Sequence, residues 1–174
     1  VVTSNFKTYK KLKRLRFYGL EQDDKKKWWN NKYYSIETGF NSRLSEIQAG
    51  ILNVKLDILD EFINRRRFIA NIYNNEILNK DIIKPFENRY NRHVYHLYVV
   101  SHKNRDLVLN KLKRQKIFLS IQYPYPLHKM KAYKTNDFEL KNSEIFSKKI
   151  FSLPIHPYLD KNSLKTIIKN LNSL

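Results

Sequence analysis

The residues best suited to bind an anion lie in a short stretch, Gly39 to Arg43. This stretch precedes a long segment with apolar residues at steps of three or four, which predicts a helix. Asn41 or Ser42 fits the N-cap position of that helix. A helix N-terminus exposes unpaired N–H groups and a partial positive charge, and both favour phosphate. Asn41 can donate its amide hydrogen to a phosphate oxygen, and a plain helix cap is the alternative.

Arg43 and a proline-rich segment offer two further sets of contacts. The guanidinium of Arg43 can hold a phosphate or a carboxylate through two parallel hydrogen bonds, or it can pair with a nearby acid. Tyr123 and His128 flank Pro124 and Pro126. Prolines remove rotational freedom and hold a loop in place. This segment is therefore expected either at the rim of a binding site or in ordinary turn packing.

Other common kinds of site have no counterpart in the sequence. The chain has no cysteine, which excludes disulfides, thiolate metal sites and cysteine nucleophiles. Its five histidines show no paired ligand spacing with carboxylates. Its three glycines form no Walker or Rossmann loop. We therefore expect no metal site in this chain.

Length and composition predict one folded core. The 174 residues are 41% hydrophobic and 29% charged, which is typical of a globular chain. The sequence has no apolar run of about 18 residues, and Val1 to Asn5 lacks the features of a signal peptide. With the absence of cysteine, these features favour the cytoplasm and no membrane partner. The two valines at the start are typical of a strand cut in the middle, so we expect a fragment.

The formal net charge of +18 has two interpretations. One is a nucleic-acid partner, because basic chains neutralise phosphates. The other is biased composition. The chain holds 24 Lys but only 10 Arg, together with 19 Asn and 17 Ile, and nucleic-acid binders tend to use arginine for base and phosphate contacts. The lysines are also scattered along the sequence, so we expect no nucleic-acid partner.

The elements around the first candidate site are mainly helical. Residues 8–17 predict a short amphipathic helix that Gly19 ends. Residues 21–31 predict a loop. The pair Trp28-Trp29 inside it is expected to pack against a neighbouring chain or domain, with a lid as the alternative.

The long apolar pattern extends over residues 44–78. Its length predicts two helices with a break near residues 57–60. Arg65 to Arg67 lie on this pattern and are expected to form a solvated face, with an anion site as the alternative.

The second half of the chain predicts a small α/β layer. Two β-branched and aromatic runs, 94–100 and 117–122, indicate strands. Three helices are expected with these starts: Asn104; Asn142 or Ser143, continuing through Ile150; and Asp160 or Asn162. The fold class is therefore α/β, with a short sheet covered by helices.

Three linked motifs resemble those of a known family. They are Gly39 to Ala49 with its continuation to Arg66; Tyr95 to Tyr98 followed by Tyr123 to His128; and Ser152 to Pro157. In this order and at these separations they are similar to the DegT/DnrJ/StrS family of sugar aminotransferases. Leu15 to Gly19 and Val1 to Thr3 match the segments that follow the cofactor lysine in that family. The resemblance covers essentially the whole chain.

The resemblance implies the fold of the aspartate aminotransferase superfamily, fold type I among pyridoxal-phosphate enzymes. Residues 1–43 would be the tail of the large cofactor-binding domain. Residues 44–174 would be the linking helix and the small C-terminal domain. The cofactor lysine and the residues that hold the pyridine ring belong upstream in this family. No catalytic residue is therefore expected in this chain, which should be inactive by itself.

The family activity moves an amino group from an amino acid, usually glutamate, to a keto group of a nucleotide-linked deoxysugar. Such reactions serve cell-surface polysaccharide and related amino-sugar biosynthesis. The implied cofactor is pyridoxal 5'-phosphate, and the full-length enzyme would be a homodimer. Asn41 would contact the cofactor phosphate of the partner subunit. Arg43, Tyr123 and His128 would contact the substrate.

Two alternatives stay open on the sequence alone. A minority of the same family are sugar dehydratases, which have histidine at the lysine position, and this chain does not contain that position. A basic nucleic-acid-binding module would also carry positive charge, and it predicts a contiguous basic face with exposed aromatic residues. The sequence does not indicate which sugar is the substrate or which ring position is aminated.

Overall fold

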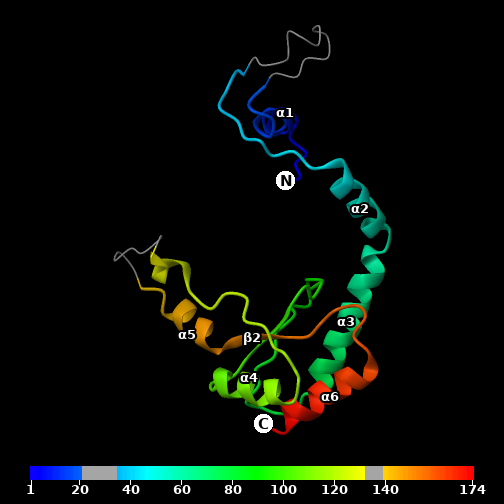
Figure 1. Cartoon of the computed structure of the whole chain (residues 1–174), viewed down its shortest axis with the longest axis vertical. Helices are drawn as coiled ribbons and strands as arrows, with labels where there is room; N and C mark the ends of the chain where they lie inside the picture. Colours follow the sequence, from blue (N-terminus) through cyan, green and yellow to red (C-terminus); the bar gives the residue numbers. More distant parts are fainter. Residues whose placement is uncertain (21–34, 132–138) are drawn as a thin grey trace. The chain divides into compact units, whose positions relative to one another are not determined.

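The computed structural model describes residues 1–20, 35–131 and 139–174 of the chain (Figure 1). These residues form two compact units, Val1–Leu56 and Asp57–Leu174. The predicted loop at 21–31 and its Trp28-Trp29 pair lie outside the described residues. The predicted division into 1–43 and 44–174 refers to the architecture of a whole enzyme and stays a prediction.

The first unit contains helix α1, Phe6–Leu15. Its N-cap is Asn5, whose side chain accepts a hydrogen bond from the Thr8 amide at 3.0 Å. The helix therefore starts two residues earlier than predicted, because the capping residue lies outside the apolar repeat. Gly19 follows the helix with φ +69°, and its amide donates to the Arg14 carbonyl at 3.0 Å. This is the left-handed helix ending that glycine favours.

Val1 to Thr3 form no strand in this structure, contrary to the prediction. Val1 and Val2 are fully exposed. A strand exists only where a neighbouring strand pairs with its backbone, and no residue of the described segments pairs with these three.

The long apolar pattern divides into α2, Glu46–Asp57, and α3, Leu59–Glu76. The break falls at Ile58, inside the predicted interval 57–60. The predicted N-cap of the first helix is wrong. Helix α2 begins only at Glu46, and the Ala49 amide donates to the Ser45 carbonyl. Asn41 and Ser42 cannot cap it, because residues 41–42 are held in extended pairing with α1's C-terminal segment.

The second unit contains a two-stranded antiparallel sheet. Strand β1, Tyr98–Ser101, pairs with β2, Ile150–Leu153, with Tyr98 opposite Leu153. Isolated bridges extend the pairing, from Ile83 to Ser101 and from Ser120 to Ser152. A short sheet accompanied by helices agrees with the predicted fold class.

Three local predictions in this unit are corrected. The strand predicted from 94 begins only at Tyr98, because Tyr95 has φ +47°, which is incompatible with a strand. The run 117–122 contributes only the bridge at Ser120. Helix α5, Lys141–Lys149, stops before Ile150, where the chain enters β2.

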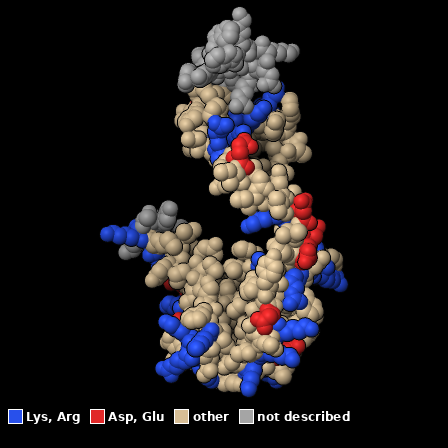
Figure 2. Space-filling view, turned by 45° about the vertical axis from the view of Figure 1, so that its right-hand side comes forward, with Lys and Arg blue, Asp and Glu red and all other residues tan. Residues whose placement is uncertain are grey.

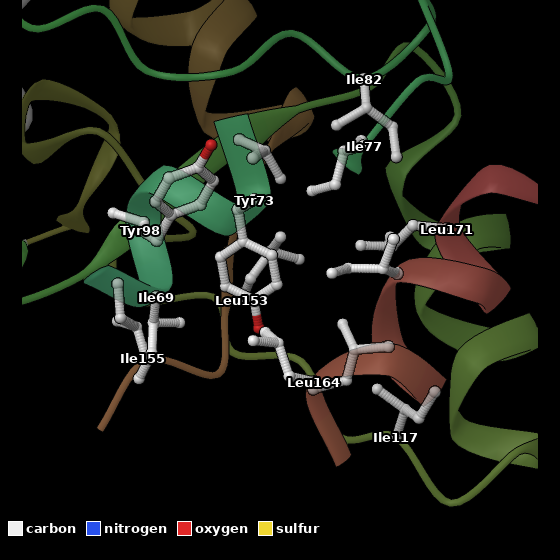
Figure 3. Close-up of a cluster of buried hydrophobic side chains, with 14 of the residues drawn as sticks. Ile69, Tyr73, Ile77, Ile82, Tyr98, Ile117, Leu153, Ile155, Leu164 and Leu171 are labelled. Carbon is white, nitrogen blue, oxygen red and sulfur yellow. The ribbon is translucent and has the colours of Figure 1, made fainter. Parts of the chain in front are cut away.

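The core of the second unit lies between the sheet and the helices α3, α4 (Arg105–Arg114) and α6 (Lys161–Asn172). Its apolar side chains point toward one another from these elements (Figure 3). Tyr73 and Leu171 are completely buried. Asp160 caps α6 as predicted, because its carboxylate accepts from the amides of Asn162 and Ser163 at 2.9 Å each.

Arg65 to Arg67 do not form the solvated face that the sequence predicted. All three side chains are half-buried. Their guanidinium groups donate as follows: Arg65 Nη2 to the Leu159 carbonyl (3.1 Å), Arg66 Nη1 to the Ile155 carbonyl (2.8 Å), and Arg67 Nη1 to Glu87 Oε1 (2.6 Å). They attach two loops to α3, and periodicity could not reveal partners about 20 to 95 residues away.

Basic side chains are dispersed on the one face of the second unit that Figure 2 shows. On this face, Lys and Arg lie in several separate groups with other residues between them. None of the helices in the described ranges combines the length and apolar character that a membrane crossing requires.

Candidate functional site

The first candidate site is built on a backbone pairing between two segments of the first unit. Phe17 and Asn41 form an antiparallel bridge. On either side of it, the Tyr18 amide donates to the Phe40 carbonyl at 2.9 Å, and the Ser42 amide donates to the Arg16 carbonyl at 2.9 Å. The backbone of residues 40–42 is therefore fixed by hydrogen bonds to the end of α1.

Two glycines allow these segments to approach. A Cβ atom on Gly39 would lie 2.1 Å from the Gly19 nitrogen, and one on Gly19 would lie 1.7 Å from the Glu37 carbonyl oxygen. Both contacts are with backbone atoms, which cannot move aside cheaply. An ion pair between Arg14 Nε and Glu37 Oε1, at 2.8 Å, also joins α1 to the segment that contains Gly39. Gly39 is thus required by chain packing.

Asn41 is exposed on this fixed backbone. Within the described ranges, no protein group hydrogen-bonds to its side-chain amide. The amide can therefore bind a ligand without first breaking a protein contact. The sequence predicted a phosphate contact or a helix cap for this residue, and the extended pairing removes the helix cap.

Arg43 lies two residues further on and is also exposed. The centre of its guanidinium lies 5.0 Å from the centroid of the Phe17 ring, a cation–π contact that leaves the N–H edges free to bind an anion. No acid within the described segments forms an ion pair with Arg43. Both residues thus contact Phe17, Asn41 through backbone pairing and Arg43 through its guanidinium.

The second candidate site is the loop that carries Tyr123 and His128. Tyr123 is 76% exposed. The loop then enters a short 3-10 helix, η1, Leu127–Lys129. Two backbone hydrogen bonds form this turn, from the Lys129 amide to the Pro126 carbonyl (2.9 Å) and from the Met130 amide to the Leu127 carbonyl (3.0 Å).

His128 points inward, unlike Tyr123. Only 5% of its side chain is exposed, and its Nε2 atom lies 3.0 Å from Oε1 of Glu144 on α5. Lys129 Nζ lies 3.2 Å from the same oxygen. The hydrogen bonds from His128 and Lys129 lower the pKa of the Glu144 carboxyl group, so it is ionised at neutral pH.

Glu144 is a residue that the sequence alone did not single out. It lies in the first turn of α5, where an acid is common because it complements the helix dipole. Nothing in the spacing of 16 residues links it to His128. Only the folded structure brings the two together.

A cavity of about 460 Å³ lies between this loop and α5. Pro124, Tyr125, Pro126 and Lys129 line it on the loop side, and Glu144, Ser147 and Lys148 line it from α5, with Arg105 from α4. Arg105 Nη1 donates to the Ser147 carbonyl, and Arg105 Nε lies 2.9 Å from Asp106. The lining combines aromatic, cationic and carboxylate groups, which can stack on and hydrogen-bond to a polar ligand.

The four predicted site residues fall into two pairs. Asn41 and Arg43 belong to the first unit, while Tyr123 and His128 belong to the second. The side chains of the first pair are both exposed, as a phosphate ligand requires. A neutral amide and a guanidinium on a fixed backbone fit the phosphate of pyridoxal phosphate. In the parts of the chain described, no three His, Asp or Glu side chains gather into a possible metal site.

Comparison with known proteins gives a consistent result. The model of the DegT/DnrJ/EryC1/StrS aminotransferase family matches residues 1–172. The chain is 35% identical over 173 residues to a dTDP-3-amino-3,6-dideoxy-alpha-D-galactopyranose transaminase of Aneurinibacillus thermoaerophilus, covering 99% of this chain and 45% of that protein. It is 35% identical over 144 residues to a UDP-2-acetamido-2-deoxy-3-oxo-D-glucuronate aminotransferase of Pseudomonas aeruginosa, covering 83% and 40%.

Solved structures show the same likeness. The S. venezuelae protein DesV superposes with a TM-score of 0.89 at 30% identity, over 99% of this chain and 45% of that one. A DegT DnrJ EryC1 StrS aminotransferase from Brucella abortus superposes with a TM-score of 0.87 at 32% identity, over 98% and 44%. The chain thus spans a little under half the length of the relatives it matches.

Proposed function

Because this chain belongs to the DegT/DnrJ/EryC1/StrS aminotransferase family, we propose that it is part of a sugar aminotransferase. The enzyme transfers an amino group from an amino acid, glutamate by preference, to a keto group of a nucleotide-linked deoxysugar. The match of the family model to residues 1–172 carries this proposal. The relatives described above are named transaminases of dTDP- and UDP-linked sugars, which supports amino transfer over dehydration.

The proposed cofactor is pyridoxal 5'-phosphate, which supplies an electron sink for amino transfer when bound. In a homodimer, Asn41 donates its side-chain N–H to the cofactor phosphate held by the partner subunit. Two observations support this role: the amide is exposed, and no described protein group hydrogen-bonds to it. The amide is neutral, so it donates to a phosphate at any working pH. Arg43 adds a positive charge beside it for the phosphate or for an anionic group of the substrate.

The second unit is proposed to contribute to the sugar pocket. Tyr123 is exposed at the start of a loop stiffened by Pro124 and Pro126. Its hydroxyl can donate to or accept from a sugar hydroxyl, while its ring excludes water. A substrate contact by His128 stays a prediction, because its side chain is buried against Glu144. The products, amino sugars, would serve polysaccharide or related biosynthesis.

The proposal is tested with the full-length gene product, pyridoxal phosphate, glutamate and a panel of dTDP- and UDP-linked keto-deoxysugars. Formation of 2-oxoglutarate and of the amino sugar in equal amounts would support it. Loss of a hydroxyl group from the sugar, with no amino sugar formed, would identify a dehydratase. No reaction with any sugar in the presence of bound cofactor would contradict both activities.

A further inference from the structure

One carboxylate connects two elements of the second unit that border the same cavity. Oε1 of Glu144 lies 3.0 Å from His128 Nε2 and 3.2 Å from Lys129 Nζ. Both partners belong to the η1 turn, whereas Glu144 belongs to α5. Since the carboxyl group is ionised at neutral pH, it accepts both hydrogen bonds, and His128 Nε2 carries a proton.

Within the described residues, the loop has few other attachments to the rest of the unit. Pro124 and Pro126 have no backbone N–H to donate. The two hydrogen bonds of the η1 turn join only residues within residues 126–130, so they shape the turn without fixing it to the rest of the unit. Among residues 122–131, His128 is the one buried side chain, while Tyr123, Tyr125 and Leu127 are each more than two-thirds exposed. His128 is therefore the inward anchor of a loop whose other large side chains face outward.

The α5 end of this connection is itself held in place. The Ser147 hydroxyl donates to the Glu144 carbonyl at 3.0 Å. The Ser147 carbonyl in turn accepts from Arg105 Nη1 on α4. Glu144 thus stands on a helix that is tied to its neighbour, so its carboxylate is a fixed point for the loop.

We infer that Glu144 is a positioning residue, which acts through His128 to hold the Tyr123–Lys129 loop in the conformation that receives the sugar. This inference rests on the proposed function, because the sugar contact of Tyr123 is part of that proposal. Glu144 itself need not touch the substrate. Its removal takes away the carboxylate that His128 Nε2 contacts and lets Tyr125, Pro124 and Pro126 shift along the cavity that they line.

The first test measures the loop directly in the full-length gene product, by hydrogen exchange of the Lys129 and Met130 amides. Glu144→Ala removes the acceptor, and Glu144→Gln keeps the shape but loses the charge. We expect exchange to speed up on the order of tenfold in Glu144→Ala and by less in Glu144→Gln. The control is Glu139→Gln, because Glu139 is 77% exposed and lies 3.7 Å from Lys141 at the start of the same helix. That variant should exchange as the wild type does.

The second test separates the two substrates of the enzyme. In Glu144→Gln, we expect KM for the keto sugar to rise on the order of tenfold, with KM for the amino donor unchanged. A purely structural defect would instead weaken the binding of both substrates and of the cofactor together. Glu139→Gln should leave both KM values as they are.

The outcomes distinguish this inference from the proposed function. Unchanged amide exchange in both Glu144 variants would overturn the positioning role, even if the enzyme is an active aminotransferase. Faster exchange with equal effects on both KM values would overturn the link to the sugar. If the wild type has no aminotransferase activity, the proposed function fails, while the exchange measurement still decides whether Glu144 holds the loop.

Discussion

The Nη1 atom of Arg67 on α3 lies 2.6 Å from Oε1 of Glu87. The same carboxylate accepts from the His93 amide at 2.7 Å and from the Tyr95 hydroxyl at 3.0 Å. These contacts join the loop before β1 to helix α3. The hydrogen bond from Arg67, followed by that from the His93 amide, lowers the pKa of Glu87 from 4.5 to about 2.

This lowered pKa predicts acid sensitivity of folding. Because the folded-state pKa lies below the unfolded value, the contribution of Glu87 is fully present above about pH 4.5 and is lost as the pH falls toward 2. Glu87→Gln should lower the free energy of unfolding at pH 7 and flatten its dependence on pH between these values. Urea unfolding of the 174-residue chain at several pH values measures this. Glu61→Gln, at an exposed position on α3, is the control, and an equal flattening there would refute the role of Glu87.

The glycines of the first unit make a matched set. Gly19→Ala and Gly39→Ala each place a methyl group against backbone atoms, at 1.7 Å and 2.1 Å, and should cost about 1–3 kcal/mol or more. A Cβ on Gly50 meets nothing within 4 Å, so Gly50→Ala should stabilise α2 by about 0.5–1 kcal/mol. Urea unfolding gives all three free energies. Similar effects for Gly39 and Gly50 would refute the close approach.

The core prediction concerns Leu171, which is completely buried on α6. Leu171→Ala should lower the free energy of unfolding by about 2–5 kcal/mol, because it removes apolar contacts and leaves a cavity. Leu107 on α4 is 69% exposed. Leu107→Ala should therefore change the free energy of unfolding by about 0.5 kcal/mol or less. Thermal unfolding monitored by circular dichroism compares the two. Equal losses would mean that the core is centred elsewhere.

The sequence predicted those elements whose signals are local. Helix α6 follows a capping Asp160 and repeats apolar residues at helical spacing. Helix α3 has the same apolar spacing after the break at Ile58, but no side chain caps it. The short β2 was missed because Ile150 to Leu153 follow α5 without a turn signal. Their strand partners, Tyr98 to Ser101, lie about fifty residues away in the chain, and no local preference encodes such a pairing.

The same limit applies to the candidate sites. The motif that contains Asn41 could be found by resemblance, yet its local pattern suggested a helix cap, and only the pairing with Phe17 shows an extended backbone. Likewise, His128 could be named from its place beside the prolines, whereas its partner Glu144 could not. A side-chain contact between distant residues depends on the packing of the elements that carry them.

If Asn41 contacts the cofactor phosphate, its replacement should weaken cofactor binding without lowering the stability of the cofactor-free protein. Its side chain caps no helix, and no described protein group hydrogen-bonds to it. Asn41→Ala should therefore leave the thermal stability of the cofactor-free protein nearly unchanged. A matched control is Asn53→Ala, because Asn53 is also exposed, on α2 of the same unit. A fall in apo stability for Asn41→Ala alone would indicate a structural role.

The most direct measurement is the dissociation constant of pyridoxal phosphate for the full-length gene product, determined by equilibrium titration of wild type, Asn41→Ala and Asn53→Ala. A hydrogen bond to a charged phosphate contributes about 1.5–3 kcal/mol. Asn41→Ala should therefore bind the cofactor roughly tenfold or more weakly, while Asn53→Ala binds it as the wild type does. An unchanged dissociation constant for Asn41→Ala would contradict the proposal that this residue holds the cofactor phosphate.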